Sequence, residues 1–157
     1  MIDFDRPTIS FRAAIAATLI STSLYGCVDA KPKMAEIVGT WSITAASRHL
    51  LPASSANTST KFEFSSNGIF VATNVPNTLF SADSLPGQPV TGRGKWKLGE
   101  REGHQQVQLE FLSTDQPERY GSDYGTQLNV DRKNANLILF YYRGDPDEQD
   151  RVEFTKQ

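Results

Sequence analysis

The sequence predicts an all-β protein, an eight-stranded up-and-down antiparallel barrel, with a two-sheet β-sandwich as the alternative. Three observations support this prediction. Short segments alternate apolar and polar residues, turn-forming residues separate them, and no stretch of useful length has the apolar spacing of a helix. A barrel is favoured over a sandwich because closure leaves no strand edge exposed to aggregation. The strands are expected at residues 39–45, 60–65, 69–75, 92–98, 105–112, 126–130, 137–142 and 151–156.

The first three expected strands follow a polar lead-in. The first strand places Trp41 and Ile43 on one face and hydroxyl side chains on the other. The second places Phe62 and Phe64 on one face, and an Asn-Gly dipeptide follows it. Because both of those residues adopt positive φ readily, they predict a tight hairpin that leads into the third strand, residues 69–75.

The next two strands have the clearest alternation. In the fourth strand, Trp96 and Leu98 point away from two lysines. The fifth strand, after a charged turn, places Val107, Leu109 and Phe111 on the inner face and polar residues between them.

The last three strands differ in pattern. The sixth and seventh are joined by a polar turn, and the seventh is apolar on both faces. This predicts either that both faces are covered or that one meets a ligand or a partner protein. In the second case the outward set is Ile138, Phe140 and Tyr142, or the alternate set. The eighth strand places Val152 and Phe154 inward.

Two connections, residues 76–89 and 113–125, are longer than hairpin turns require. Loops of that length are uncommon unless they cover or bind something. If both lie at one end of a barrel, their large side chains would rim its mouth. The predicted ligand-binding residues are therefore Leu79, Phe80, Tyr120 and Tyr124.

Length and composition limit the function. The chain has 157 residues, a net charge of −2, 38% hydrophobic residues and 22% charged residues, which fits one globular domain. A nucleic-acid partner is not expected, since such proteins usually present a basic face. No run of eighteen apolar residues occurs, so we expect no spanning helix.

The amino-terminal segment has the character of an export signal. Residues 13–25 form an apolar run that is too short to cross a bilayer but suits a signal peptide. The sequence Leu24-Tyr25-Gly26-Cys27 follows and resembles the lipobox of bacterial lipoproteins. This resemblance implies cleavage before Cys27, the only cysteine, and lipidation of its thiol. The expected division is a signal peptide at residues 1–26, a lipidated tether at 27–37 and a β-barrel domain at 38–157.

The lipobox also implies where the protein resides. Several acyl chains on one cysteine would hold it on a membrane nearly permanently. Val28, where an aspartate would favour retention in the inner membrane, resembles the outer-membrane sorting pattern of Gram-negative lipoproteins. We therefore expect a protein of the cell envelope, anchored to the outer membrane and facing the periplasm.

The expected barrel domain has a Gly-x-Trp in the first strand (Gly39, Trp41), a second Gly-x-Trp ending at Trp96 and the hairpin of residues 62–68. With these motifs it resembles the lipocalin-like (calycin-type) domains of small bacterial lipoproteins. This resemblance implies that Trp41 packs across the closed end of the barrel.

The resemblance also implies an arginine near the last strand that packs against Trp41, and Arg143 and Arg151 are the candidates. A barrel of this kind implies a small apolar or amphipathic ligand. Fold alone does not establish that activity.

Few residues suggest chemistry. His49 and His104 lie in polar turns without metal-ligand spacing, so neither predicts a zinc site. An acidic cluster near residue 147 predicts a solvated turn, with a cation or basic-partner site as the less favoured alternative. The cluster contains Asp145, Asp147, Glu148 and Asp150. No nucleophile elbow or glycine-rich phosphate loop is present, so we expect no enzymatic activity, no cofactor and no metal.

Two functions follow as hypotheses. The first is a non-enzymatic lipoprotein that binds a small apolar or amphipathic molecule inside its barrel. The second is a protein-binding lipoprotein, either an inhibitor or immunity factor or an accessory subunit of an envelope complex. In the second case the barrel would be filled with side chains, and outward apolar residues of the seventh strand would form the binding patch. An interior cavity distinguishes the two.

Overall fold

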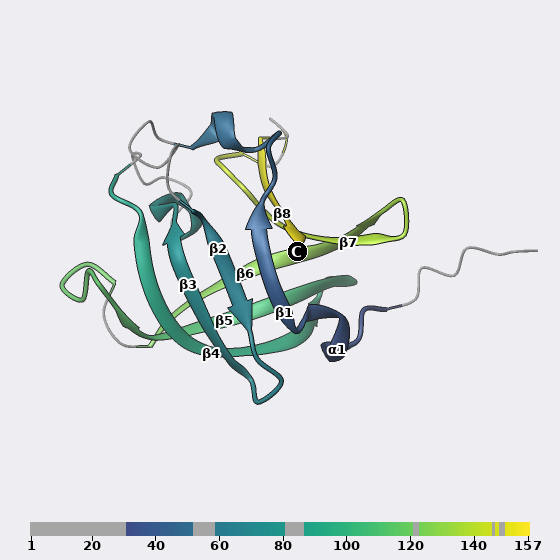
Figure 1. Ribbon diagram of the computed structural model, residues 1–157, viewed down its shortest axis with the longest axis horizontal. Coiled ribbons are helices and arrows are strands. Elements are labelled where there is room, and N and C mark those ends of the chain that lie inside the picture. The colour runs from purple at the N-terminus through teal and green to yellow at the C-terminus, as the bar shows by residue number, and fades with distance from the viewer. Residues whose placement is uncertain (1–30, 52–58, 81–86, 121–122, 146, 148–149) are drawn as a thin grey trace, which may run out of the picture.

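The computed structural model describes residues 31–51, 59–80, 87–120, 123–145, 147 and 150–157. Eight strands, one short α-helix and two 3-10 turns make up this part of the chain (Figure 1). In order they are α1 Met34–Ile37, β1 Gly39–Ile43, η1 Arg48–Leu50, β2 Lys61–Phe64, β3 Ile69–Val75, η2 Asn77–Leu79, β4 Val90–Arg101, β5 His104–Thr114, β6 Tyr124–Lys133, β7 Asn136–Tyr142 and β8 Arg151–Lys156.

The strands close into one antiparallel up-and-down barrel. Each strand pairs with the next along the chain, and β8 returns to pair with β1. In Figure 1, β1, β2 and β3 run across the front of the barrel while β5, β6 and β7 pass behind them at a steep angle. The predicted barrel is confirmed, and the sandwich alternative is wrong because no free edge separates two sheets.

The strands β4, β5 and β6 are longer than the alternation predicted. Pairing of β4 with β5 continues as far as Arg101 and His104, where a tight turn with positive φ at Glu102 and Gly103 reverses the chain. Tyr124, which the sequence placed in a loop, is the first residue of β6 and pairs with Phe111. Backbone hydrogen bonds extend these strands past the point where apolar side chains stop, so the hydrophobic pattern underestimates their length.

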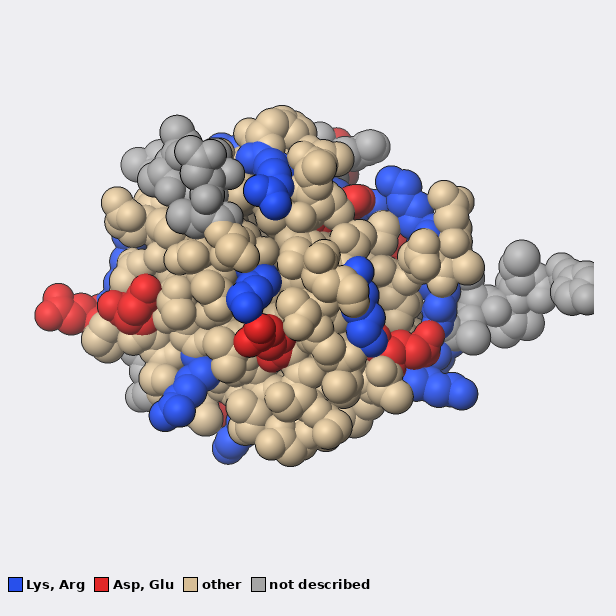
Figure 2. Space-filling view, in the orientation of Figure 1, with Lys and Arg blue, Asp and Glu red and all other residues tan. Residues whose placement is uncertain are grey.

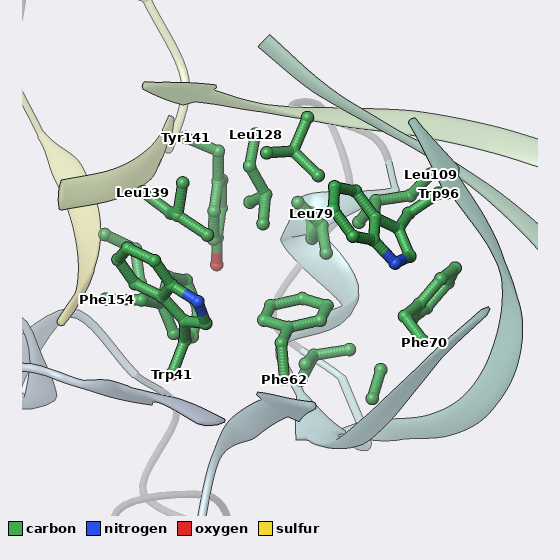
Figure 3. Close-up of a cluster of buried hydrophobic side chains, with 14 of the residues drawn as sticks. Trp41, Phe62, Phe70, Leu79, Trp96, Leu109, Leu128, Leu139, Tyr141 and Phe154 are labelled. Atoms are coloured by element: carbon green, nitrogen blue, oxygen red, sulfur yellow. The ribbon is translucent and has the colours of Figure 1, made fainter. Parts of the chain in front are cut away.

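Aromatic and aliphatic side chains fill the barrel interior. Trp41, Phe62, Phe70, Phe111 and Phe154 are all less than 2% exposed. Side chains from strands on opposite sides point toward one another in the close-up of the core (Figure 3). The Phe62 ring meets the Phe154 ring edge-on at 5.2 Å between centroids, and the Phe70 ring meets Phe111 in the same way at 4.9 Å. Such edge contacts add to the free energy of burial.

The end of the barrel nearest the amino terminus is closed by α1. Ile37 and Trp41 are wholly buried, and the Trp41 indole N–H donates to the Ile37 carbonyl oxygen at 2.6 Å. Gly39 lies between them with φ of +129°, and the Lys156 side chain occupies the space of a Cβ at that position. The folded domain therefore begins at or before Met34, and residues 34–37, predicted as tether, belong to it.

Neither predicted arginine contacts Trp41, so that expectation is wrong. Arg143 follows β7, at the end of the barrel opposite α1, and donates to the Leu50 carbonyl oxygen at 2.9 Å. Arg151 lies on the outer face, with its guanidinium carbon 4.6 Å from the centroid of the Phe140 ring. Arg143 lies beyond the end of β7 and Arg151 points outward from β8, so proximity to the last strand in the sequence does not bring either side chain to Trp41.

The outward face of β7 is covered. Leu139 and Tyr141 point into the core, whereas Ile138 and Phe140 point outward and are still only 4% and 8% exposed. Arg151 covers Phe140 from above, and Tyr142 packs against it edge-on at 5.4 Å. The predicted exposed apolar patch on this strand is therefore absent, because a long cationic side chain of β8 shields it.

Candidate functional site

Three of the four predicted ligand-binding residues, Phe80, Tyr120 and Tyr124, pack together at the end of the barrel opposite α1, and Leu79 belongs to the same hydrophobic core. The rings of Phe80 and Tyr120 stack at 4.4 Å between centroids, and Tyr124 packs against both. Phe80 also contacts Phe111 of β5, at 4.9 Å. Sequence reasoning therefore identified side chains that come together. Leu79, Phe80 and Tyr120 are each buried, however, so they form a plug in the mouth rather than an open rim.

Hydrogen bonds hold this plug in place. The carbonyl oxygen of Leu79 accepts from the Thr126 hydroxyl at 2.8 Å, and that of Phe80 accepts from the Tyr124 hydroxyl. Thr78 forms a hydrogen bond with the Tyr141 hydroxyl at 3.2 Å inside the barrel. We call residues 76–80 the plug segment; three of its side chains, Asn77, Thr78 and Leu79, are buried within the 3-10 turn η2.

The Tyr141 hydroxyl is buried in this part of the interior. Burial raises the pKa of the Tyr141 hydroxyl far above its usual value, while the hydrogen bond with Thr78 acts weakly in the opposite direction. The Tyr120 hydroxyl is also buried and has no hydrogen-bond partner in the described part of the chain. Burial of this kind favours the neutral form of the Tyr141 hydroxyl over the charged form.

A basic stripe lies on the outer face of the barrel along β4. Its members share one face of the strand and are exposed: Arg93, Lys95, Lys97 and Arg101. The stripe borders a hollow of about 870 Å³ over β4, β5 and β6, to which Glu110 contributes the acidic side chain. Gly125 of β6 lines the hollow as well, and its lack of a side chain contributes to the depth.

Exposed apolar residues flank the basic stripe. Ile69 and Val71 of β3 are 38% and 39% exposed, and Leu112 of β5 is 38% exposed. Val71 lies beside Arg93 in the strand register, which links the two kinds of surface. Figure 2, which views the molecule from the side of β1, β2 and β3, shows lysine, arginine and acidic side chains scattered among uncharged ones. The outer face of β3, β4 and β5 thus combines positive charge with apolar contacts.

A second hollow, of about 480 Å³, adjoins the first on the outer face, and both are lined by Arg101 and Gln127. Gln106, Asn129 and Phe140 form its floor across β5, β6 and β7. We call this second hollow the amide groove. Gln106 occupies a position where the strand alternation expects a polar residue, so no signal in the sequence identified the amide groove.

The residues of the two Gly-x-Trp motifs, Gly39, Trp41 and Trp96, lie where they pack the barrel. Trp96 is 4% exposed, packs edge-on against Phe64 at 5.3 Å and donates its indole N–H to the Ser65 carbonyl oxygen at 3.0 Å. Gly94 precedes it because a Cβ there would overlap the carbonyl oxygen of Glu110. The second Gly-x-Trp therefore reflects close packing of β4 on β5.

The remaining candidates give no assembled site. His49 Nδ1 lies 2.6 Å from the Ala46 carbonyl oxygen, and His104 is exposed. In the acidic turn, Asp145 accepts from the Asp147 backbone N–H at 2.9 Å, and Glu148 lies outside the described residues. Among the described residues, no three histidine, cysteine or acidic side chains gather as metal ligands would. Cys27 also lies outside the described residues.

Comparison with known proteins gives no relative: no family model, no curated protein and no solved structure matches the chain. In the part of the chain that the structure describes, no helix has the length and apolar character needed to span a membrane. The class of protein is therefore defined by its fold alone, an eight-stranded up-and-down β-barrel with a filled interior.

Proposed function

We propose that this chain is a non-enzymatic binding protein of the cell envelope, anchored by lipid at Cys27, that recognises an envelope protein through the outside of its barrel. One observation carries this proposal: the barrel interior is packed with aromatic side chains and its mouth is occupied by the plug segment. A carrier for a small apolar ligand needs an internal cavity. The filled interior therefore favours the protein-binding hypothesis over the carrier hypothesis.

The basic stripe and its apolar neighbours support the choice of surface. Positive charge speeds association with an acidic partner, and exposed Ile69, Val71 and Leu112 supply apolar area to bury. The chemistry of this face fits an acidic protein surface that is flanked by apolar residues. The lipid anchor is supported by the lipobox resemblance around Cys27 and by no other observation.

Photo-crosslinking in intact cells tests the recognition surface. A photoreactive residue placed at Lys97 should capture one defined envelope protein. A photoreactive residue placed at Ile69 should capture the same protein, and the double substitution of Lys95→Glu and Lys97→Glu should abolish that second capture. Thr155 of β8 provides the matched control, because β8 lies on the opposite side of the closed strand order from β4. Equal capture from Thr155 would contradict this surface. Capture of lipid alone would indicate that the stripe faces the membrane instead.

A native mass spectrum of the protein released from its own envelope tests the rejected carrier hypothesis. We expect the mass of the polypeptide alone. A reproducible extra mass of a few hundred daltons, lost on denaturation, would restore a ligand-filled barrel and overturn the proposal.

The lipid anchor is tested by Cys27→Ser in the full-length chain. We expect the protein to move from the membrane fraction to the soluble fraction, because the acyl chains have no other attachment point. An unchanged membrane fraction would contradict lipidation at this residue.

A further inference from the structure

The amide groove contains a buried hydrogen-bond acceptor without a partner. Gln106 is only 6% exposed, although it points to the outer face of β5. Its side-chain N–H donates to the Asn129 side-chain oxygen at 3.1 Å, while its own side-chain oxygen has no partner in the described part of the chain. A buried acceptor without a donor costs free energy in the unliganded protein, on the order of 1–3 kcal/mol. A ligand that donates a hydrogen bond there would remove that cost.

The groove around Gln106 is held rigid. The guanidinium carbon of Arg151 lies 4.6 Å from the centroid of the Phe140 ring, and the guanidinium forms ion pairs with Glu153 at 2.6 Å and with Asp131 at 3.5 Å. The ring of Tyr142 is fixed against Phe140 at an interplanar angle of 89°. Because these side chains are already positioned, a ligand would lose little free energy to ordering them.

The charges of the groove are balanced. Its lining includes the cations Arg101 and Arg151 and the anions Glu102 and Asp131. This balance separates it from the neighbouring hollow, where three basic side chains meet one acid. The groove therefore suits a neutral, hydrogen-bonding ligand rather than an ion.

The closed barrel also limits which class of ligand the amide groove can bind. An extended peptide commonly binds by adding a strand to an open sheet edge, and a barrel whose eight strands all pair offers no such edge. Side-chain amides, by contrast, match vicinal hydroxyl groups, which donate to an amide oxygen and accept from an amide N–H. The ring of Tyr142 offers an aromatic surface for the carbon face of a sugar.

We propose that the amide groove binds a neutral saccharide, with a sugar hydroxyl donating to the side-chain oxygen of Gln106. The adjoining amides of Asn129 and Gln127 donate to neighbouring hydroxyl oxygens, and Tyr142 covers one face of the sugar ring. The groove shares Arg101 with the basic stripe, but the residues proposed to bind the sugar lie outside the stripe, so the proposal does not depend on the protein partner.

The test uses the full chain in detergent and three neutral probes: diacetylchitobiose, maltose and lactose. Ligand-observed NMR should detect binding of at least one probe, and amide chemical shifts should change at residues 106, 127 and 129. Gln106→Leu should weaken that binding at least tenfold. The same variant should keep or raise the melting temperature, because it removes a buried acceptor that has no partner. A Gln106 that served only to stabilise the fold would lower it.

Gln108→Leu is the matched control, since Gln108 lies two residues along the same outer face and lines the neighbouring hollow. It should leave saccharide binding unchanged. The proposal is overturned if none of the three probes binds, if the shifts fall elsewhere, or if Gln106→Leu binds as tightly as the parent. Loss of crosslinking to the envelope protein in Gln106→Leu would also overturn it, since the groove would then belong to the protein interface. Charge reversal at Lys95 and Lys97 tests only the protein partner and should not alter saccharide binding.

Discussion

The two ends of the barrel are closed in different ways. At the α1 end, Ile37 and Trp41 are wholly buried, and the one polar atom of the indole is satisfied by a carbonyl oxygen. At the opposite end, the plug segment carries buried polar side chains, Asn77 and Thr78, and three hydrogen bonds to β6 and β7 hold it. The first closure depends mainly on apolar burial, and the second also depends on hydrogen bonds between buried polar groups.

This difference explains why a carrier function fits poorly. A mouth that admits ligands must open at low cost, but here opening would leave the Leu79 and Phe80 carbonyl partners and the Tyr141 hydroxyl without hydrogen bonds. Each buried polar group left unpaired costs on the order of 1–3 kcal/mol. Recognition is therefore expected on the outer face, where charge and apolar residues are already exposed.

The largest expected effect is at the α1 end. Trp41→Ala should lower the free energy of unfolding by roughly 3–5 kcal/mol, because it removes a wholly buried ring and leaves a cavity. Chemical denaturation of the folded domain measures this. Trp41→Phe, which keeps most of the apolar volume but loses the indole N–H, should cost less. A melting temperature within one or two degrees of the parent for Trp41→Ala would show that this end does not organise the fold.

The plug end is tested by Phe80→Ala. We expect a loss of about 3 kcal/mol, at the lower end of the range for such changes, because the side chain lies at the edge of the core where water can relax the cavity. The same denaturation experiment measures it. Leu112→Ala, which removes an exposed apolar side chain, serves as control and should change stability little. An equally small effect of Phe80→Ala would mean that the plug leaves the barrel readily, and would revive the carrier hypothesis.

Alkaline pH should lower the stability of the protein through Tyr141 at the plug end. The folded pKa of Tyr141 lies above the unfolded value of 10.0, so its contribution to stability is complete below that pH and is lost as pH rises further. The parent should therefore lose stability more steeply than Tyr141→Phe above about pH 10. Denaturant midpoints at a series of pH values measure the two slopes. Thr78→Val keeps the titrating hydroxyl and should retain the steep slope; identical slopes for parent and Tyr141→Phe would contradict the raised pKa of Tyr141.

Acidic pH should lower the stability of the protein through Glu36 at the α1 end, by less than alkaline pH does through Tyr141. The backbone N–H of Lys33 and the Arg132 guanidinium hold the pKa of Glu36 below its ordinary value of 4.5. Its contribution is therefore present above that pH and lost as pH falls through the lower folded value. The stability difference between the parent and Glu36→Gln should shrink as the pH falls below 4.5 toward the lower pKa of the folded state. A difference that stays constant would mean that the carboxylate charge contributes nothing.

Particular residues show how far the sequence predicted the site. Leu79, Phe80, Tyr120 and Tyr124 were selected from loop length and side-chain size, and they do lie together. Whether they line an opening or fill it depends on how far the loop enters the barrel, which loop composition does not encode. The amide groove was missed because Gln106 follows the expected outward alternation, and its burial on the outer face is a feature of the tertiary structure.

The sequence by itself determined the eight strands, their order along the chain, the tight turns and the inward positions of Trp41 and Trp96. Local alternation and turn residues encode these features, since each involves neighbours within a few residues. Only the tertiary structure decided that the barrel is filled, that the plug segment closes its mouth, that Arg151 rather than solvent covers β7, and that the amide of Gln106 is buried. Those features depend on contacts between residues far apart in the chain, whose distances follow from strand register and barrel closure.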